Sequence, residues 1–335
     1  MPVPVKDKED LLKHVTTRAA LALIGAAVLT PALRGSERTQ SMAAAPVLRS
    51  SMLVTTGWLQ SHLADRNLVV LYIGQDRTRF DEGHVPRSHF VRLDDLVEQH
   101  TNSLNELPPV ADLQALFESL GIGDNSRVVV MGDRGGVFAA RAYFTLDYLG
   151  HGDQVSLLDG GLEQWAAEGK ALSREEAHPA QASFTPRVQS GILVSTAQMQ
   201  KLVQKQLSGS ASAYVLLDAR PTTEFDGVVN SEAVAQAGHI AGAHSLYWKN
   251  LIRSEADPTF LGMHELEQQF ARAGARPGKT VITYCRTGMQ SSLTYFVAKY
   301  LGYKAAMYDG SVYEWVKAAG NGLVVSPTRA GAAHP

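Results

Sequence analysis

The single cysteine of the chain is the residue best suited to nucleophilic chemistry. Cys285 follows the β-branched run Val281-Ile282-Thr283 and precedes a helical stretch over residues 292–299. Backbone N–H groups and the positive end of a helix stabilise a thiolate and can hold an anion. A strand that delivers a thiol into a short loop opening a helix therefore predicts a catalytic nucleophile at Cys285, and not merely a small buried hydrophobe.

The same strand–loop–helix pattern occurs earlier in the chain, where Asp133 takes the place of the cysteine. With Asp133 set on Cys285, the next residues correspond directly: Arg134 and Arg286, Gly136 and Gly288, and Tyr143-Phe144 and Tyr295-Phe296. After a slip of two residues Asp159-Gly160 falls on Asp309-Gly310, and upstream His84 corresponds to His239. A repeat of this length indicates a duplicated domain and not a short solenoid unit. One copy has the nucleophile and the other has a carboxylate in its place.

Both copies require a scaffold that brings strand ends and helix starts together. Strand-like runs alternate with helical stretches, which predicts an α/β fold with two tandem domains, each a mainly parallel sheet flanked by helices. We expect strands over 68–73, 128–131, 155–158, 214–217, 281–284 and 305–308. We expect helices over 111–120, 138–149, 162–168, 266–273, 291–300 and 312–319. The predicted domains are 54–177 and 192–326, joined by a linker over 178–191 and followed by a disordered tail over 327–335.

Composition narrows the classes of function. The 335 residues suffice for two domains, and the hydrophobic and charged fractions of 45% and 19% are typical of a globular protein. A net charge of −2 provides no overall positive field for nucleic acid. One cysteine excludes an intramolecular disulfide and a multi-cysteine metal site, and we expect neither a metal nor an organic cofactor.

Residues 1–50 are interpreted as a leader and a linker. Four basic residues, Lys6, Lys8, Lys13 and Arg18, precede an apolar run over 19–29 that ends at Thr30-Pro31-Ala32. This pattern is typical of a secretory signal, so we expect export to the periplasm, with a cytoplasmic protein carrying a disordered leader as the alternative. The apolar run is too short to span a bilayer comfortably, so we expect no stable membrane span in the mature protein.

Four motifs, in this order, carry a family resemblance. They are Asp218-Ala219-Arg220 with Glu224-Phe225, Gly238-His239-Ile240-Ala241-Gly242-Ala243, Cys285-Arg286-Thr287-Gly288 and Asp309-Gly310-Ser311. Together with the degenerate first copy, the chain resembles the tandem rhodanese-like sulfurtransferases, which act on thiosulfate or 3-mercaptopyruvate. The resemblance covers roughly residues 54–325. It implies a catalytically silent first domain and a persulfide on the cysteine of the second.

The resemblance also implies a reaction and a set of site residues. The Cys285 thiolate attacks the sulfane sulfur of a small anionic donor, and a thiophilic acceptor such as cyanide or a thiol then removes that sulfur.

We expect the loop to bind the donor through Arg286, Thr287, Gly288, Met289 and Gln290. Its N–H groups would stabilise the anionic sulfur, since glycine at 288 permits a positive φ. Ser291 and Asp218 are candidates to support the loop, and for Asp218 a structural role as the cap of a strand end is favoured over hydrogen bonds to the loop amides. Asp133 is expected to bind the amides of the first loop, and His239 and His84 to hold turns.

The identity of the donor stays open at this point. The loop Cys-Arg-Thr-Gly-Met-Gln matches neither the Cys-Arg-Lys-Gly-Val-Thr pattern of thiosulfate enzymes nor the Cys-Gly-Ser-Gly-Val-Thr pattern of mercaptopyruvate enzymes. Arg286 favours thiosulfate, whereas the neutral Thr287 weakens that preference. Glu224 stands where many animal members have a substrate-binding arginine, so that role is not carried over.

Two other functions are compatible with a loop cysteine. A cysteine phosphatase needs an arginine six positions after the nucleophile to bind phosphate bidentately, and Ser291 stands there. The phosphatase is therefore disfavoured. A persulfide carrier that delivers sulfur to a protein partner, without efficient turnover of small molecules, remains the alternative to an enzyme. The sequence does not indicate an oligomeric state.

Overall fold

The computed structural model describes residues 48–325, apart from 102, 210–211, 231–233, 235 and 319. The expected leader up to residue 47 and the expected tail over 327–335 lie outside the described residues. Within the described ranges, no helix is long and apolar enough to cross a bilayer.

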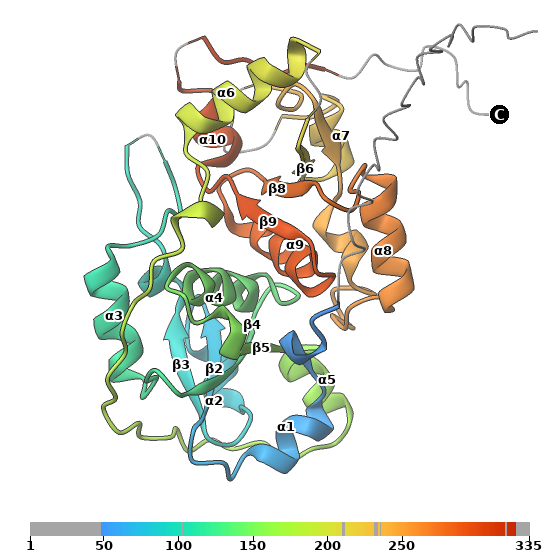
Figure 1. Cartoon of the computed structure of the whole chain (residues 1–335). Helices are drawn as coiled ribbons and strands as arrows, with labels where there is room; N and C mark the ends of the chain where they lie inside the picture. The colour runs from blue at the N-terminus through green and yellow to red at the C-terminus, as the bar shows by residue number, and fades with distance from the viewer. Residues whose placement is uncertain are drawn as a thin grey trace, which may run out of the picture. The chain divides into compact units, whose positions relative to one another are not determined.

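The first domain is built on a sheet in which every neighbouring pair of strands is parallel (Figure 1). In spatial order its strands are β1 (Leu53–Val54), β5 (Val155–Leu158), β4 (Arg127–Gly132), β2 (Leu68–Gly74) and β3 (Ser88–Arg92). Its helices are α1 (Thr56–His62), α2 (Thr78–Glu82), α3 (Val110–Ser119), α4 (Val137–Tyr148) and α5 (Gly161–Ala167). The central strands β2 and β4 are buried beyond their first residue, because helices cover both faces of the sheet.

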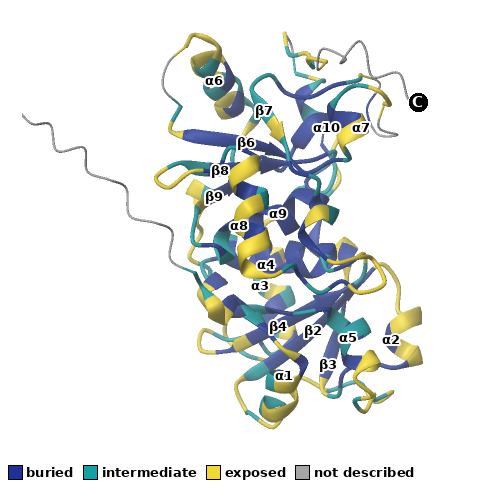
Figure 2. Ribbon diagram, turned by 90° about the vertical axis from the view of Figure 1, so that its right-hand side faces the viewer, coloured by how far each residue is buried: buried dark blue, intermediate teal, exposed yellow. Residues whose placement is uncertain are grey.

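The second domain repeats this plan. Its parallel strands, in spatial order, are β7 (Ala243–Ser245), β6 (Tyr214–Asp218), β8 (Thr280–Tyr284) and β9 (Lys304–Met307). Its helices are α6 (Thr196–Leu207), α7 (Thr222–Phe225), α8 (Met263–Arg272), α9 (Met289–Tyr300) and α10 (Ser311–Trp315). Short 3-10 helices complete the described chain: η1 (Ser50–Met52), η2 (Leu93–Leu96), η3 (Gly152–Gln154), η4 (Ser190–Ile192) and η5 (Trp248–Leu251). Figure 2 shows the central strands of both sheets as buried.

The predicted α/β class with two tandem parallel sheets is confirmed. All six expected strands are present, with ends that differ by at most one residue. The helix expected over 312–319 is wrong at its end, because α10 stops at Trp315. There the side chain of Asn321 donates to the Trp315 carbonyl at 3.0 Å, and Gly320 turns the chain with φ 79°. The N–H groups of Lys317 and Ala318 still donate to the Glu314 carbonyl, at 3.1 and 3.2 Å, so the chain leaves the helix through a turn and not at an abrupt stop.

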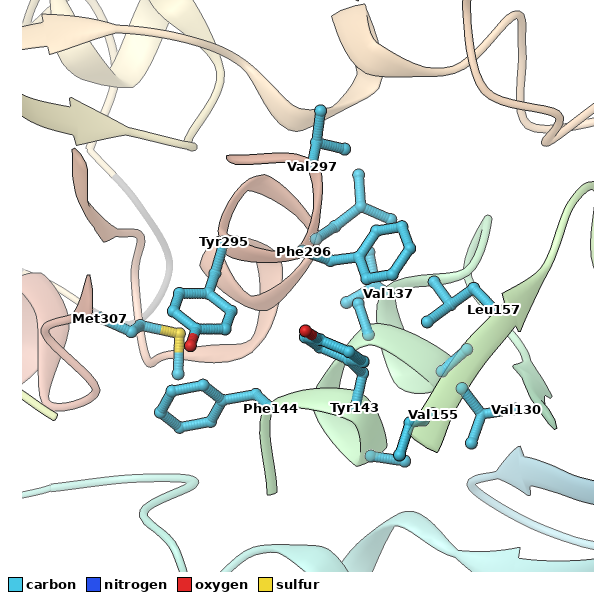
Figure 3. Packing of buried hydrophobic residues seen from close by; sticks show 14 of the residues in the cluster. Val130, Val137, Tyr143, Phe144, Val155, Leu157, Tyr295, Phe296, Val297 and Met307 are labelled. Atoms are coloured by element: carbon cyan, nitrogen blue, oxygen red, sulfur yellow. The ribbon is translucent and has the colours of Figure 1, made fainter. Parts of the chain in front are cut away.

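The domains meet through α4 and α9, which are equivalent helices of the repeat (Figure 1). Tyr143 packs edge-on against Phe296 and Phe144 packs edge-on against Tyr295, each with ring centroids 5.1 Å apart (Figure 3). Such T-shaped pairs are favourable beyond the apolar area they bury. One hydrophobic cluster contains residues of both domains, so the two sheets share a core across this helix pair.

Candidate active site

The candidate nucleophile lies between β8 and α9. The strand ends at Tyr284, Cys285 follows it, and the helix begins at Met289. The thiol is free and its residue is only 1% exposed. Gly288 has φ 88°, and a Cβ at this position would collide with the carboxylate of Asp309, so glycine is required here. The loop thus places the thiol beside the first turn of a helix of 12 residues.

A serine hydroxyl from another segment holds this loop. Ser311 Oγ accepts hydrogen bonds from the N–H groups of Cys285 and Gly288, both at 3.0 Å, and donates to the Tyr308 carbonyl at 3.0 Å. Ser311 therefore occupies the N–H groups of Cys285 and Gly288, two of the loop amides that were expected to stabilise the anionic sulfur. The N–H groups of Arg286 and Thr287 donate to no acceptor among the described residues and are left for a ligand.

Arg286 does not extend freely toward a donor. Its Nε donates to both carboxylate oxygens of Glu224, at 3.0 and 2.9 Å, and its Nη2 also contacts that carboxylate. The Glu224 side chain is 4% exposed, whereas the Arg286 side chain is 32% exposed. The hydrogen bonds to Glu224 raise the pKa of the Arg286 guanidinium, although its partial burial opposes the shift. Glu224 thus fixes the orientation of Arg286 and compensates part of its charge.

Three other residues of the expected site, Thr287, Met289 and Ser291, each have a different environment. Thr287 accepts hydrogen bonds from Asn105 Nδ2 of the first domain, at 2.8 Å to its Oγ1 and 3.2 Å to its carbonyl oxygen. The Met289 side chain is buried in the shared hydrophobic cluster, so only its backbone could meet a donor. Ser291 Oγ donates to the Gly288 carbonyl at 2.9 Å and supports the loop from within α9.

Asp218 does not bind the loop amides. Its carboxylate accepts from the Arg220 backbone N–H at 3.0 Å and from the Arg220 guanidinium, which also donates to the Gly238 carbonyl at 2.8 Å. The loop-supporting role of Asp218 is therefore wrong, whereas the favoured structural role at the strand end agrees with these contacts. Both repeat histidines hold turns as expected: His239 Nδ1 donates to the Phe225 carbonyl and His84 Nδ1 to the Phe80 carbonyl, each at 2.8 Å.

A cleft of about 450 Å³ opens beside the loop and is lined by both domains. The lining includes Arg79, Arg134 and Glu163 from the first domain, and Trp248, Arg286 and Gln290 from the second. Arg286 lies in the Cys285 loop and Gln290 in the first turn of α9, so the cleft borders the loop, although Cys285 itself is not among the lining residues. Its size suits a small molecule.

A family model described as the rhodanese-like domain matches this chain twice, over residues 55–168 and 199–318. The chain belongs to the rhodanese-like family. It is 31% identical to the sulfur carrier protein TtuD of Thermus thermophilus, over 79% of this chain and 93% of that protein. It is 32% identical to a Pseudomonas aeruginosa protein named as a 3-mercaptopyruvate sulfurtransferase, over 80% and 96% of the two chains. A Saccharopolyspora erythraea protein named for thiosulfate sulfurtransferase activity is 30% identical, over 80% and 94%.

Solved structures share the fold at lower identity. The 3-mercaptopyruvate sulfurtransferase SseA of Escherichia coli superposes with a TM-score of 0.68 at 21% identity, over 78% of this chain and 98% of that one. EanB in complex with ergothioneine gives a TM-score of 0.73 at 21% identity, over 83% and 71% of the two chains. These likenesses establish the fold alone. The curated relatives make the chain a rhodanese-like sulfurtransferase with tandem domains.

The corresponding loop of the first rhodanese-like domain has no thiol and therefore cannot form a persulfide. Asp133 stands at the position of the thiol, where its carboxylate accepts from the Tyr72 hydroxyl and lies 3.6 Å from Arg79. Burial raises the pKa of Asp133, with the Tyr72 hydrogen bond opposing the shift. The expectation that Asp133 binds its own loop amides is wrong, because its partners are side chains. Gly161 follows Asp159-Gly160, at the place that Ser311 takes in the second domain. The first domain thus lacks both the thiol and the hydroxyl that holds the loop.

Sequence reasoning noted Ser311 only as part of a family motif and gave it no role. Its function depends on a contact between β8 and the segment after β9, which strand and helix patterns do not reveal. The signal that could have found it is the comparison of Asp309-Gly310-Ser311 with Asp159-Gly160-Gly161, where the serine is lost together with the cysteine.

Proposed function

We propose that the chain transfers a sulfur atom from a small anionic donor to a thiophilic acceptor through a persulfide on Cys285. Thiosulfate is the favoured donor and 3-mercaptopyruvate the alternative, with cyanide or a thiol as acceptor. The proposal rests on one observation. Ser311 fixes the loop so that Cys285 lies at the start of α9 while the N–H groups of Arg286 and Thr287 stay unengaged. Such donors stabilise negative charge on a sulfur or an oxyanion.

The steps balance without a metal or an external oxidant. The Cys285 thiolate attacks the outer sulfur of thiosulfate, the S–S bond of the donor breaks, and sulfite leaves with the bonding electron pair. Cyanide or a thiolate then attacks the terminal sulfur of the persulfide. The cysteine S–S bond breaks and the thiolate is regenerated, with thiocyanate or a new persulfide as product.

A persulfide carrier is the second candidate, because one relative is named a sulfur carrier protein. Direct delivery to a protein partner requires that the partner reach the sulfur. Cys285 is only 1% exposed and its loop borders a small cleft, which favours small acceptors over a protein thiol. Efficient turnover with cyanide or a low-molecular-weight thiol would support the enzyme, whereas sulfur transfer only to a protein would support the carrier.

The test of the intermediate is intact-mass spectrometry of the full chain. Treatment with thiosulfate should add the mass of one sulfur atom, and cyanide should remove it. Cys285→Ser should show neither the mass change nor turnover, because a hydroxyl does not form the persulfide. Turnover by Cys285→Ser would overturn the proposal. Steady-state rates with thiosulfate and 3-mercaptopyruvate, both with cyanide as acceptor, decide between the donors.

A further inference from the structure

We infer that the first rhodanese-like domain binds the charged end of the sulfur donor through the guanidinium of Arg134. This domain would then be silent in covalent chemistry but not in binding. The inference rests on the proposed function for the donor class and for the role of Cys285. It departs from the sequence interpretation, in which Arg134 is only the counterpart of Arg286 beside a lost nucleophile.

The two loops of the repeat open to one cleft. Arg134 follows Asp133 in the first loop, Arg286 follows Cys285 in the second, and both line the same 450 Å³ cavity. The loop of Arg134 also touches the second domain. A Cβ on Gly135 would lie 3.1 Å from the side chain of Ile252 and 3.3 Å from the ring of Trp248. Arg134 therefore lines the cleft that borders the Cys285 loop and is not a distant surface residue.

The charges around the cleft leave Arg134 unpaired. Arg79 pairs with Glu163 at 2.7 Å. Lys249 contacts Glu255, and Arg286 is held by Glu224. Among the described residues no carboxylate pairs with Arg134, whose side chain is exposed and lies 5.9 Å from the centre of the Phe138 ring. An arginine fork with no protein partner suits a small dianion, because it can bind two oxygens at once.

Two residues that line the same cleft have buried polar atoms without a hydrogen-bond partner, which is a second indication of a binding site. The indole N–H of Trp248 and the Gln290 carbonyl oxygen are buried and have no hydrogen-bond partner among the described residues. Both residues line the cleft with Arg134. Buried polar atoms are nearly always satisfied, by protein, by ordered water or by a ligand. A sulfonate oxygen of thiosulfate can accept from the indole N–H of Trp248, whereas the Gln290 oxygen is an acceptor and requires a donor such as water.

The backbone at Arg134 allows a substitution that removes the side-chain charge without distorting the loop. Arg134 has φ 56°, in the left-handed region, and two glycines with positive φ follow it. Asparagine tolerates this conformation better than other non-glycine residues, so Arg134→Asn removes the charge without adding strain. Arg134→Lys retains the charge without the fork. Arg66→Asn is the matched control, because Arg66 is an exposed arginine of the same domain that does not line the cleft.

The test compares two donors that differ in charge but present the same kind of sulfane sulfur. Thiosulfate is a dianion and an alkanethiosulfonate is a monoanion. We expect Arg134→Asn to lower kcat/KM for thiosulfate roughly tenfold, mainly through KM, as for the loss of one charge-assisted contact. The loss of kcat/KM with the alkanethiosulfonate should be smaller. Arg134→Lys should lose less kcat/KM for thiosulfate than Arg134→Asn, and Arg66→Asn should match the wild type with both donors. Rates equal to those of Arg66→Asn with both donors would overturn the inference and leave the proposed function intact.

A binding measurement separates this inference from the proposed function. Calorimetry of thiosulfate binding to the Cys285→Ser protein requires no turnover. Adding Arg134→Asn should weaken that binding roughly tenfold, whereas adding Arg66→Asn should not change it. Equal affinities in all three proteins would overturn the inference. Absence of a persulfide in the wild type would overturn the proposed function, while the calorimetric comparison would still decide whether Arg134 binds the anion.

Discussion

The guanidinium of Arg141 and the carboxylate of Asp309 form a buried ion pair between the two domains, with Nη1 2.6 Å from Oδ1 and Nη2 3.1 Å from Oδ2. Asp309 lies two residues before Ser311, which holds the Cys285 loop. Arg141 Nη2 also contacts the carbonyl of Asn105, whose side chain binds Thr287. Helix α4 of the first domain is therefore tied to the nucleophile loop from two sides.

The first prediction concerns this ion pair. Arg141→Met should lower the free energy of unfolding by about 3–5 kcal/mol, because it leaves the buried Asp309 carboxylate without its counter-ion. Adding Asp309→Asn should recover part of the loss, since the unpaired charge is then gone. Urea denaturation of the wild type and both variants measures this. An Arg141→Met protein as stable as the wild type would mean that Asp309 is not held in the folded state as described.

The second prediction concerns Ser311. Ser311→Ala removes the acceptor of the Cys285 and Gly288 N–H groups, so the loop should lose its fixed geometry. We expect kcat to fall roughly ten- to a hundredfold, comparable to the loss of a positioned contact in an active site. Ser88→Ala is the control, because it deletes a buried hydroxyl in the first domain that donates to the Val85 carbonyl at 2.6 Å. If both variants lose activity equally, the effect is one of general stability.

The third prediction concerns Arg286 and its partner Glu224. Arg286→Gly should lower the free energy of unfolding by less than the about 3–5 kcal/mol of a fully buried pair, because the nearly buried Glu224 loses its main counter-ion and keeps only the Arg220 guanidinium, 4.0 Å away. Adding Glu224→Gln should restore stability and allow the donor preference to be measured.

In that double variant we expect kcat/KM for thiosulfate to fall roughly ten- to a hundredfold, while use of 3-mercaptopyruvate is retained. Steady-state kinetics with both donors and urea denaturation provide the measurements. Equal losses with both donors would assign Arg286 to loop geometry and not to donor choice.

The fourth prediction is a pH dependence of stability. His151 is buried and donates through Nε2 to the Ser126 carbonyl at 2.9 Å. Burial lowers its pKa, while the hydrogen bond to Ser126 and the nearby Asp124 oppose the shift and Arg187 adds to it. In the unfolded chain His151 becomes protonated near pH 6.5, whereas in the folded protein it stays neutral to lower pH. Its contribution to the free energy of unfolding is therefore fully present above about pH 6.5 and decreases as the pH falls below that value.

The measurement is the free energy of unfolding at pH 7.5 and pH 5.5 for the wild type and for His151→Gln. The wild type should lose more stability over this interval, by up to about 1.4 kcal/mol per pH unit for each such group. His89 and His244 also have pKa values lowered by burial, so part of the loss should remain in the variant. Identical losses in both proteins would show that His151 is not the group responsible.

Much of the scaffold could be predicted because its signals are local. The apolar runs at 68–73 and 281–284 are strands buried on both faces, and the loop around Cys285 lies directly after one of them. The missed helix α6 also had a local signal, since Ser195 and Gln198 form a capping box at its start. The short strands β1, β3 and β7 are set mainly by pairing with neighbours, which periodicity does not reveal.

The partners within the site could not be predicted in the same way. Ser311, Glu224 and Asn105 act on the Cys285 loop from segments that only the tertiary fold brings to it. The sequence left two roles open for Asp218, and its hydrogen bond with the adjacent guanidinium of Arg220 decides between them. That contact exists only in the folded structure and is not visible in the sequence. Arg134 was assigned to the copy without a nucleophile, because the sequence does not show that the two loops open to a single cleft.

The reciprocal contacts of α4 and α9 have a consequence for the origin of the cleft. Tyr143 meets Phe296 while its repeat counterpart Tyr295 meets Phe144, which is the exchange found at an isologous, twofold interface. Each copy thus carries a self-complementary face, and the chain joins covalently what would otherwise be two subunits of a dimer. Because the connection makes this association intramolecular, the cleft between the loops forms at any protein concentration, and each loop was free to diverge without changing the other.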